Sequence, residues 1–197
     1  YTRPGAGTTR RRRDRGRGGA ETFMTTGPIA IVVGTRPEII KMAPVVRACA
    51  ERGAPFLLLH TGQHYSFEMD GLFFRELELP APHHNLEVGS GSQAYQIGAI
   101  VSGLEPILAR ERPPVLLVEG DTNSVLAAGL AAHKLGIRVG HVEAGLRSYD
   151  RSMPEEINRI LTDHLADHLF APTERAREIL LGEGVGRHPG LLRQRGR

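Results

Sequence analysis

The sequence contains one cysteine, no tryptophan and no long hydrophobic run. A single cysteine excludes a disulfide-stapled fold and suits a reducing compartment, so we interpret Cys49 as a small core residue and expect a cytoplasmic protein. The apolar segments are much shorter than the ~18 residues that cross a bilayer, and the arginine-rich start lacks the apolar region of a secretory signal. We therefore expect no membrane partner.

Three familiar site motifs are also missing. The turn VVGTRPEIIK (32–41) lacks the Gly-x-Gly-x-x-Gly fingerprint that binds the pyrophosphate of NAD. The sequence contains no Gly-Lys-Ser/Thr phosphate loop and no Gly-x-Ser-x-Gly nucleophile elbow. These absences argue against tight NAD binding at this turn, against a P-loop and against a serine nucleophile of that type.

A histidine pair comes nearest to a metal-binding pattern. His164 and His168 lie four residues apart, and each is preceded by an aspartate, which imitates a set of metal ligands on one helix face. Leucines accompany both histidines, however, and the helical pattern can end between them. We expect no metal site.

The basic character of the chain is confined to its two ends. The formal net charge is +3, but residues 1–23 contain seven arginines against two acids, and residues 187–197 contain four arginines and no acid. Residues 24–186 carry a net charge of −6. No aromatic or nucleic-acid-binding motif accompanies the basic ends, so we expect disordered tails and no nucleic-acid partner.

Strand and helix patterns alternate along the middle of the chain. Continuous apolar runs predict strands that are covered on both faces, and a helical period follows each run. This alternation predicts an α/β fold with a doubly wound, Rossmann-like parallel sheet. The predicted strands are 29–33, 56–60, 85–88, 115–118, 138–143 and 168–171, and the predicted helices are 39–51, 67–77, 93–110, 124–135, 154–165 and 174–181.

The chain divides into three predicted parts. Residues 1–23 are of low complexity and predict a disordered tail of non-native character, with Met24 as the natural start. Residues 24–185 form the Rossmann-like domain. Residues 186–197 have neither period and no apolar run suited to a strand, so we predict an unpatterned tail there.

Ionisable side chains follow three of the predicted strands. In a parallel sheet the turns after the strands lie on one edge, so these side chains can converge there. Arginine and lysine at such turns suit an anionic ligand, such as a phosphate or a nucleotide sugar. Alternatively, an acid after a strand only caps the next helix, and Asp121-Thr-Asn does resemble a helix cap. The residues are Arg36, Glu38 and Lys41 after the first strand, Asp121 after the fourth, and Glu143 and Arg147 after the fifth.

Five segments resemble the UDP-N-acetylglucosamine 2-epimerases of the non-hydrolysing type. They are GTRPEIIKMAP (34–44), TGQH (61–64), EGDTNSVLAA (119–128), HVEAGLRS (141–148) and MPEEINRILTDHLADHLFAPTE (153–174). The resemblance implies the N-terminal half of a two-domain fold of glycosyltransferase-B type, with the active site between the domains. The family's essential histidine and most of its uridine and diphosphate contacts belong to the second domain, which we expect to be missing here.

The resemblance implies reversible epimerisation at carbon 2 of UDP-N-acetylglucosamine (UDP-GlcNAc) to UDP-N-acetylmannosamine (UDP-ManNAc), for surface polysaccharide precursors. The carbon-2 hydrogen is not acidic, so the family expels UDP from the anomeric carbon while a base removes this proton. UDP then re-adds to the 2-acetamidoglucal intermediate. This route needs carboxylates and cations and no cofactor.

Matched position by position, the resemblance implies catalytic roles for Asp121, Glu143 and Glu155. Gln63 and His64 belong to a segment that is linked in some members to a second, regulatory UDP-GlcNAc. Members are commonly homodimers. The expected substrate-binding residues are Arg36, Lys41, Gln63, His64 and Arg147.

Two alternatives remain open. A hydrolysing relative would release N-acetylmannosamine and UDP from the same substrate. A non-catalytic half-domain would bind a sugar nucleotide without turning it over, and the abrupt change of sequence character after Gly184 favours this alternative.

Overall fold

The computed structural model describes residues 27–63, 67–185 and 191–193. The predicted tail 1–23, the predicted start at Met24 and the candidate residue His64 lie outside these residues, as do 186–190 and 194–197. The division of the chain at 24 and 185 stays a prediction. Among the described residues, no helix combines the length and the apolar character that a membrane crossing needs.

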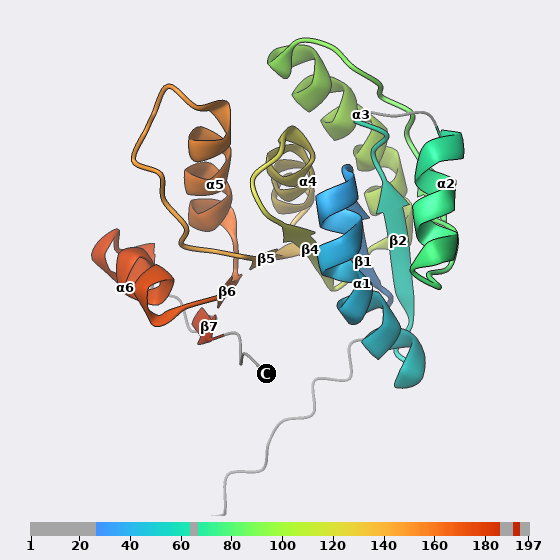
Figure 1. The fold of residues 1–197 in the computed structure, drawn as a ribbon, viewed down its shortest axis with the longest axis horizontal. Coiled ribbons are helices and arrows are strands. Elements are labelled where there is room, and N and C mark those ends of the chain that lie inside the picture. The colour runs from blue at the N-terminus through green and yellow to red at the C-terminus, as the bar shows by residue number, and fades with distance from the viewer. Residues whose placement is uncertain (1–26, 64–66, 186–190, 194–197) are drawn as a thin grey trace, which may run out of the picture.

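The strands form one sheet in which every neighbouring pair is parallel (Figure 1). Their order across the sheet is β3-β2-β1-β4-β5-β6-β7. The strands are β1 (Ile29–Val33), β2 (Phe56–His60), β3 (His84–Asn85), β4 (Val115–Glu119), β5 (Arg138–Val142), β6 (His168–Ala171) and β7 (Leu191–Arg193).

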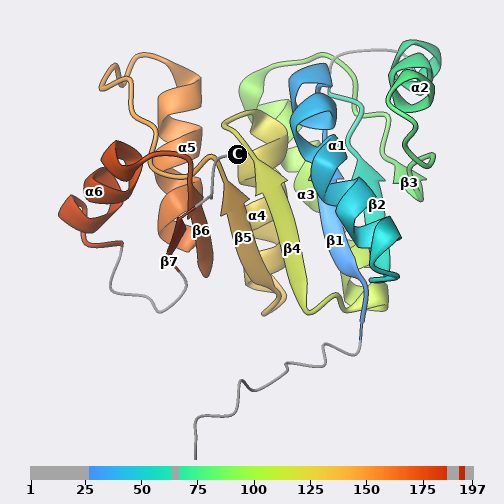
Figure 2. The same cartoon turned by 60° about the horizontal axis from the view of Figure 1, so that its bottom comes forward.

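Helices cover both faces of this sheet, as Figure 2 shows. Successive residues of a strand point to opposite faces, so β1 contributes to two separate cores. Ile31 and Val33 pack in one core with residues of α1 and α2, and Ala30 and Val32 pack in the other with residues of α3 and α4. The helices are α1 (Arg36–Glu51), α2 (Phe67–Glu76), α3 (Gln93–Glu111), α4 (Asn123–Lys134), α5 (Pro154–Leu165) and α6 (Glu174–Gly182).

The predicted doubly wound parallel sheet is confirmed, and β1, β2, β6 and α5 have the predicted bounds. Helix α5 ends at Leu165, before β6 begins at His168, so His164 and His168 do not share a helix face.

Two strand predictions were wrong. The third strand is His84–Asn85 instead of 85–88, because the Asn85 side chain accepts a hydrogen bond from the N–H of Glu87, whose φ of 51° turns the chain away. No strand was predicted after Val185, yet Leu191–Arg193 pairs with β6. Backbone groups alone make such a ladder, so a three-residue edge strand needs no apolar period.

The order of the strands indicates where a ligand site is expected. Successive strands extend the sheet in one direction from β1 to β3 and in the other from β4 to β7, so the direction of winding reverses between β1 and β4. In open α/β sheets, ligands bind at the carboxyl ends of the strands that flank such a reversal. Glu38 and Lys41 lie in the first two turns of α1, which follows β1, and Asp121 lies in the turn after β4.

Gly145 allows the chain that leaves β5 to pass close to α6. Its φ is 82°, and a Cβ atom at this position would lie 2.3 Å from the carbonyl oxygen of Ala176. Gly53 is a matched comparison, because it has a φ of 63° and open space around its Cα.

We predict that Gly53→Ala lowers the free energy of unfolding by about 1–2 kcal/mol, the cost of a left-handed backbone with a Cβ. Gly145→Ala should lower the free energy of unfolding by the same amount and by about 1–3 kcal/mol more, because the added Cβ overlaps the backbone of Ala176. Urea denaturation of both variants measures the difference. Equal losses would contradict the close contact with α6.

Candidate active site

Glu38 ties together the turns after β1 and β4. Its carboxyl group is 2% exposed and accepts hydrogen bonds from the N–H groups of Gly34 and Thr35, and from Oγ1 of Thr122 at 2.6 Å. Burial raises the pKa of Glu38 to about 7, against the opposing effect of these hydrogen bonds. One carboxyl group therefore fixes both turns at the reversal point.

Thr122 also caps helix α4, because its hydroxyl oxygen accepts a hydrogen bond from the N–H of Val125 at 3.4 Å. In the segment Asp121-Thr-Asn, the residue that caps the helix is therefore Thr122. The capping alternative does not apply to the carboxylate of Asp121, which interacts with another helix.

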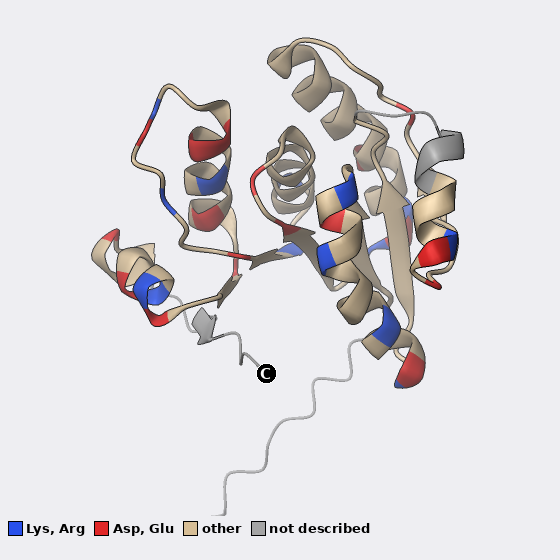
Figure 3. Cartoon of the chain, viewed as in Figure 1, with Lys and Arg blue, Asp and Glu red and all other residues tan. Residues whose placement is uncertain are grey.

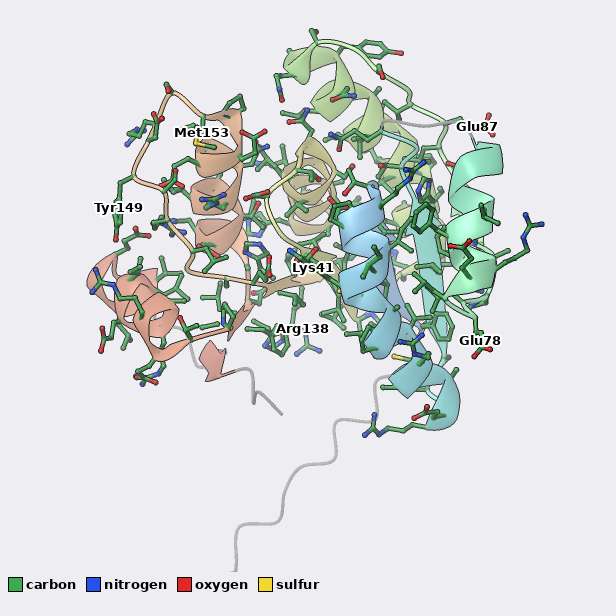
Figure 4. All side chains as sticks on the ribbon, viewed as in Figure 1. Lys41, Glu78, Glu87, Arg138, Tyr149 and Met153 are labelled. Atoms are coloured by element: carbon green, nitrogen blue, oxygen red, sulfur yellow. The ribbon has the colours of Figure 1, made fainter. Side chains whose placement is uncertain are left out.

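Lys41 joins carboxyl groups from two neighbouring strands. Its Nζ lies 2.9 Å from Oε1 of Glu119, at the end of β4, and 2.7 Å from Oε2 of Glu143, directly after β5. Figure 4 shows Lys41 on α1, facing the edge where these strands end. Lys41 and Glu143 therefore meet as the order of the turns predicts.

The two carboxyl groups titrate in opposite directions. Burial, together with a hydrogen bond to Glu143, raises the pKa of Glu119 to about 8, although Lys41 opposes this rise. Burial also acts on Glu143, but the hydrogen bonds of Lys41 and Glu119 and the charge of Lys41 outweigh it and hold the pKa of Glu143 below its ordinary value. Burial would lower the pKa of Lys41, but its two carboxyl partners raise it.

The backbone of Glu143 is held in the left-handed region, with a φ of 66°. This conformation is uncommon for a residue with a side chain, and such conformations cluster at functional sites. The strained backbone turns the Glu143 carboxylate toward Lys41 of a different element.

Asp121 lies against Arg159 of α5. Arg159 forms ion pairs with Oδ2 of Asp121 and, at 2.8 Å, with Oε2 of Glu156. The Asp121 backbone oxygen accepts a hydrogen bond from the amide group of Asn158 at 3.0 Å. The Asp121 side chain is 33% exposed, so its carboxylate is oriented by α5 and still reaches solvent.

A polar pocket with a volume of about 220 Å³ lies beside this turn. Both Glu155 and Gln63 line it. Its amide side chains are held in a relay in which Asn158 donates to Asn123, Asn123 donates to Gln96, and Gln96 donates to the backbone carbonyl of Gln63. The lining residues are Gln63, Gly91, Gln93, Gln96, Thr122, Asn123, Glu155 and Asn158.

Arg147 lies apart from Lys41 and Glu143, in a buried ion-pair network. Its side chain is 1% exposed and contacts Asp163 Oδ2 at 2.7 Å and also Glu183. Burial works against ionisation of Asp163, but the hydrogen bonds and charges of His141 and Arg147 outweigh it and lower the pKa of Asp163. The predicted convergence therefore does not extend to Arg147, which holds the segment after β5 onto α5 and α6.

Arg36 occupies the first turn of α1. Its guanidinium carbon lies 4.7 Å from the centre of the Phe73 ring of α2, a cation–π contact that orients the group. Figure 3 shows residues of both charge signs along the start of α1 and along α5, the helices that border the site.

The sequence analysis missed Glu119, Arg159 and Asn158 as site residues. Glu119 had a readable signal, because it is a charged residue at the end of an otherwise apolar strand run. Arg159 and Asn158 had a weaker one, since they lie one turn along α5 from Glu155.

The fold and the position of this site define a Rossmann-like domain of glycosyltransferase-B type. At the level of the fold alone, the chain matches MurG of Acinetobacter baumannii with a TM-score of 0.56 and 10% identity over 86% of this chain and 45% of that one. A family model described as UDP-N-acetylglucosamine 2-epimerase matches residues 47–189, and the chain belongs to this family. The resemblance predicted from the five segments is confirmed.

Individual relatives agree with this assignment. The UDP-N-acetylglucosamine 2-epimerase of Methanocaldococcus jannaschii is 54% identical over 157 residues, which are 80% of this chain and 43% of the relative. The crystal structure of that organism's UDP-GlcNAc 2-epimerase in complex with UDP-GlcNAc and UDP matches with a TM-score of 0.80 and 52% identity, over 84% of this chain and 45% of that one. The chain thus spans less than half the length of these relatives.

We predict that Glu38 makes stability depend on pH. Its pKa is about 7 in the folded state against an ordinary 4.5, so its contribution to stability is full below pH 4.5 and is lost as the pH rises to 7. Glu38→Gln imitates the protonated acid and removes this loss. The stability of the variant relative to the unchanged chain should therefore rise by about 3 kcal/mol between these pH values.

Urea denaturation at several pH values measures this difference. Glu174→Gln on α6 is the matched control, because its side chain is 50% exposed. A constant difference between Glu38→Gln and the unchanged chain across this range would contradict the assignment.

Proposed function

We propose that this domain serves the reversible epimerisation of UDP-GlcNAc to UDP-ManNAc by elimination and re-addition of UDP, in the supply of surface polysaccharide precursors. The observation that carries the proposal is the Lys41–Glu143 pair at the carboxyl edge of the sheet, next to the reversal between β1 and β4. A carboxylate whose pKa lies below its ordinary value is ionised at neutral pH and can accept a proton. Family membership supplies the substrate class.

In this proposal Glu143 accepts the carbon-2 proton, a double bond forms between carbons 1 and 2, and the anomeric C–O electrons leave with UDP. Return of UDP to carbon 1 and of a proton to carbon 2 completes the exchange. Asp121, oriented by Arg159, and Glu155, at the polar pocket, are the two further carboxylates available for proton transfer.

The substrate lies across the same edge of the sheet in this proposal. Arg36 and Lys41 provide positive charge beside the turn after β1, and Gln63 offers a positioned amide group in the pocket. Arg147 is proposed as a supporting residue that holds the β5–α5 segment. The chemistry requires no cofactor and no metal.

A cytoplasmic location and a homodimer are part of the proposal. An apolar groove lined by Leu126, Leu130 and Leu161, with other residues of α4 and α5, supports association, since Leu161 is 47% exposed.

The test uses a fusion of this chain to the complementary part of the Methanocaldococcus jannaschii relative, because the chain spans 43% of that relative. In D₂O, we expect UDP-GlcNAc and UDP-ManNAc to equilibrate with deuterium at carbon 2, as followed by NMR. Glu143→Gln and Asp121→Asn should slow the exchange by about 10²–10⁴-fold, because each removes a proton-transferring carboxylate. Glu174→Gln is the control and should leave the rate unchanged.

The other outcomes separate the alternatives. Release of free UDP and N-acetylmannosamine in equal amounts would replace epimerisation by hydrolysis. Binding of UDP-GlcNAc without any deuterium exchange would support the non-catalytic half-domain. Full activity in Glu143→Gln would refute the assigned base.

A further inference from the structure

Two carboxyl groups and one ammonium group form an unbalanced cluster at the sheet edge. Lys41 Nζ contacts both Glu119 and Glu143, at 2.9 Å and 2.7 Å. The side chain of Glu119 is 1% exposed and that of Glu143 is 29% exposed. With both acids ionised, two negative charges would face one positive charge, and the negative charge on Glu119 would be almost fully buried.

The two carboxyl groups contact the same ammonium group, so their negative charges lie close together. One ammonium group balances one carboxylate, so a proton on the other carboxyl group removes the excess negative charge. Burial penalises the charged form most where water is excluded. The proton therefore belongs to Glu119, the more buried of the two.

The surrounding charges favour the same distribution. The charge of His141 lowers the pKa of Glu143. The two ring nitrogens of His141 face oxygen atoms, at 2.7 Å from Asp163 Oδ1 and 2.7 Å from the Gly120 carbonyl. Glu38, the acid of α1 nearest in sequence to Lys41, is engaged by the turns after β1 and β4.

We propose that Glu119 is a positioning residue that holds a proton, so that Lys41 neutralises only Glu143 and keeps it an ionised base. The side chain of Glu119 is almost fully buried, so it acts through Glu143 instead of contacting a substrate. The use of Glu143 as a base rests on the proposed function, whereas the protonation of Glu119 is a property of the chain itself.

Ionisation of Glu119 ends this arrangement. As the pH rises through its pKa of about 8, a second carboxylate competes for Lys41 and repels Glu143. The environment of the Glu143 carboxylate must therefore change twice with pH, once when it binds its own proton and again when Glu119 loses its proton.

The test is an NMR titration of the chain labelled with ¹³C at the glutamate carboxyl carbons, from about pH 3 to about pH 10. We expect one signal with a pKa near 8 that is absent in Glu119→Gln. The Glu143 signal should show one step below pH 4.5 and a smaller step near 8, and Glu119→Gln should remove only the smaller step.

Two variants control the assignment. Glu38 also titrates at raised pH, with a pKa of about 7, and Glu38→Gln identifies its signal. Glu178→Gln removes a carboxyl group that is 60% exposed on α6 and should leave both steps of Glu143 unchanged.

A Glu119 signal that titrates below about pH 6 would overturn the proposal. So would a step near pH 8 that persists for Glu143 in Glu119→Gln. If that variant does not fold, the position of the Glu119 signal in the unchanged chain decides. The titration uses no sugar, so a negative result would leave the epimerase proposal standing. If the titration gives the expected steps but the fusion protein does not epimerise the substrate, only the proposed function is refuted.

Discussion

The ammonium group of Lys41 is the contact on which the arrangement of the site depends. It comes from the helix after β1, yet its two partners, Glu119 and Glu143, stand at the ends of β4 and β5. Buried carboxyl groups must be paired or protonated, so the parallel sheet has to bring these three strand ends into register. The parallel pairing of β1 with β4, and of β4 with β5, supplies that register.

A second charged network connects β5 and the segment after it to the turn after β4 and to α5. His141 bridges the Gly120 carbonyl and Asp163, and Arg147 completes the contact with Asp163. The segment that follows β5 also depends on Glu156, which accepts hydrogen bonds from the backbone of Ser148 and Tyr149. Figure 4 shows Tyr149 and Met153 on this segment, at the far side of the site from α2.

Much of this arrangement could be predicted from the sequence. Apolar runs and helical periods located the strands and helices, because a sheet covered on both faces leaves a strong pattern. The meeting of Lys41 and Glu143 followed from the rule that parallel strands end at one edge. The ion pair between Arg147 and Asp163 could not be predicted, because tertiary packing decides whether an arginine contacts a ligand or a buried carboxylate. Strand β7 was not predicted, because backbone pairing needs no side-chain pattern.

The most direct test of the central claim is a crystal structure of the fusion protein with UDP-GlcNAc. The account predicts that the sugar ring lies over the carboxyl ends of β1, β4 and β5, with carbon 2 about 3–3.5 Å from the carboxylate of Glu143. A sugar nucleotide bound away from this edge, or a sugar ring held beyond the reach of Glu143, would contradict it.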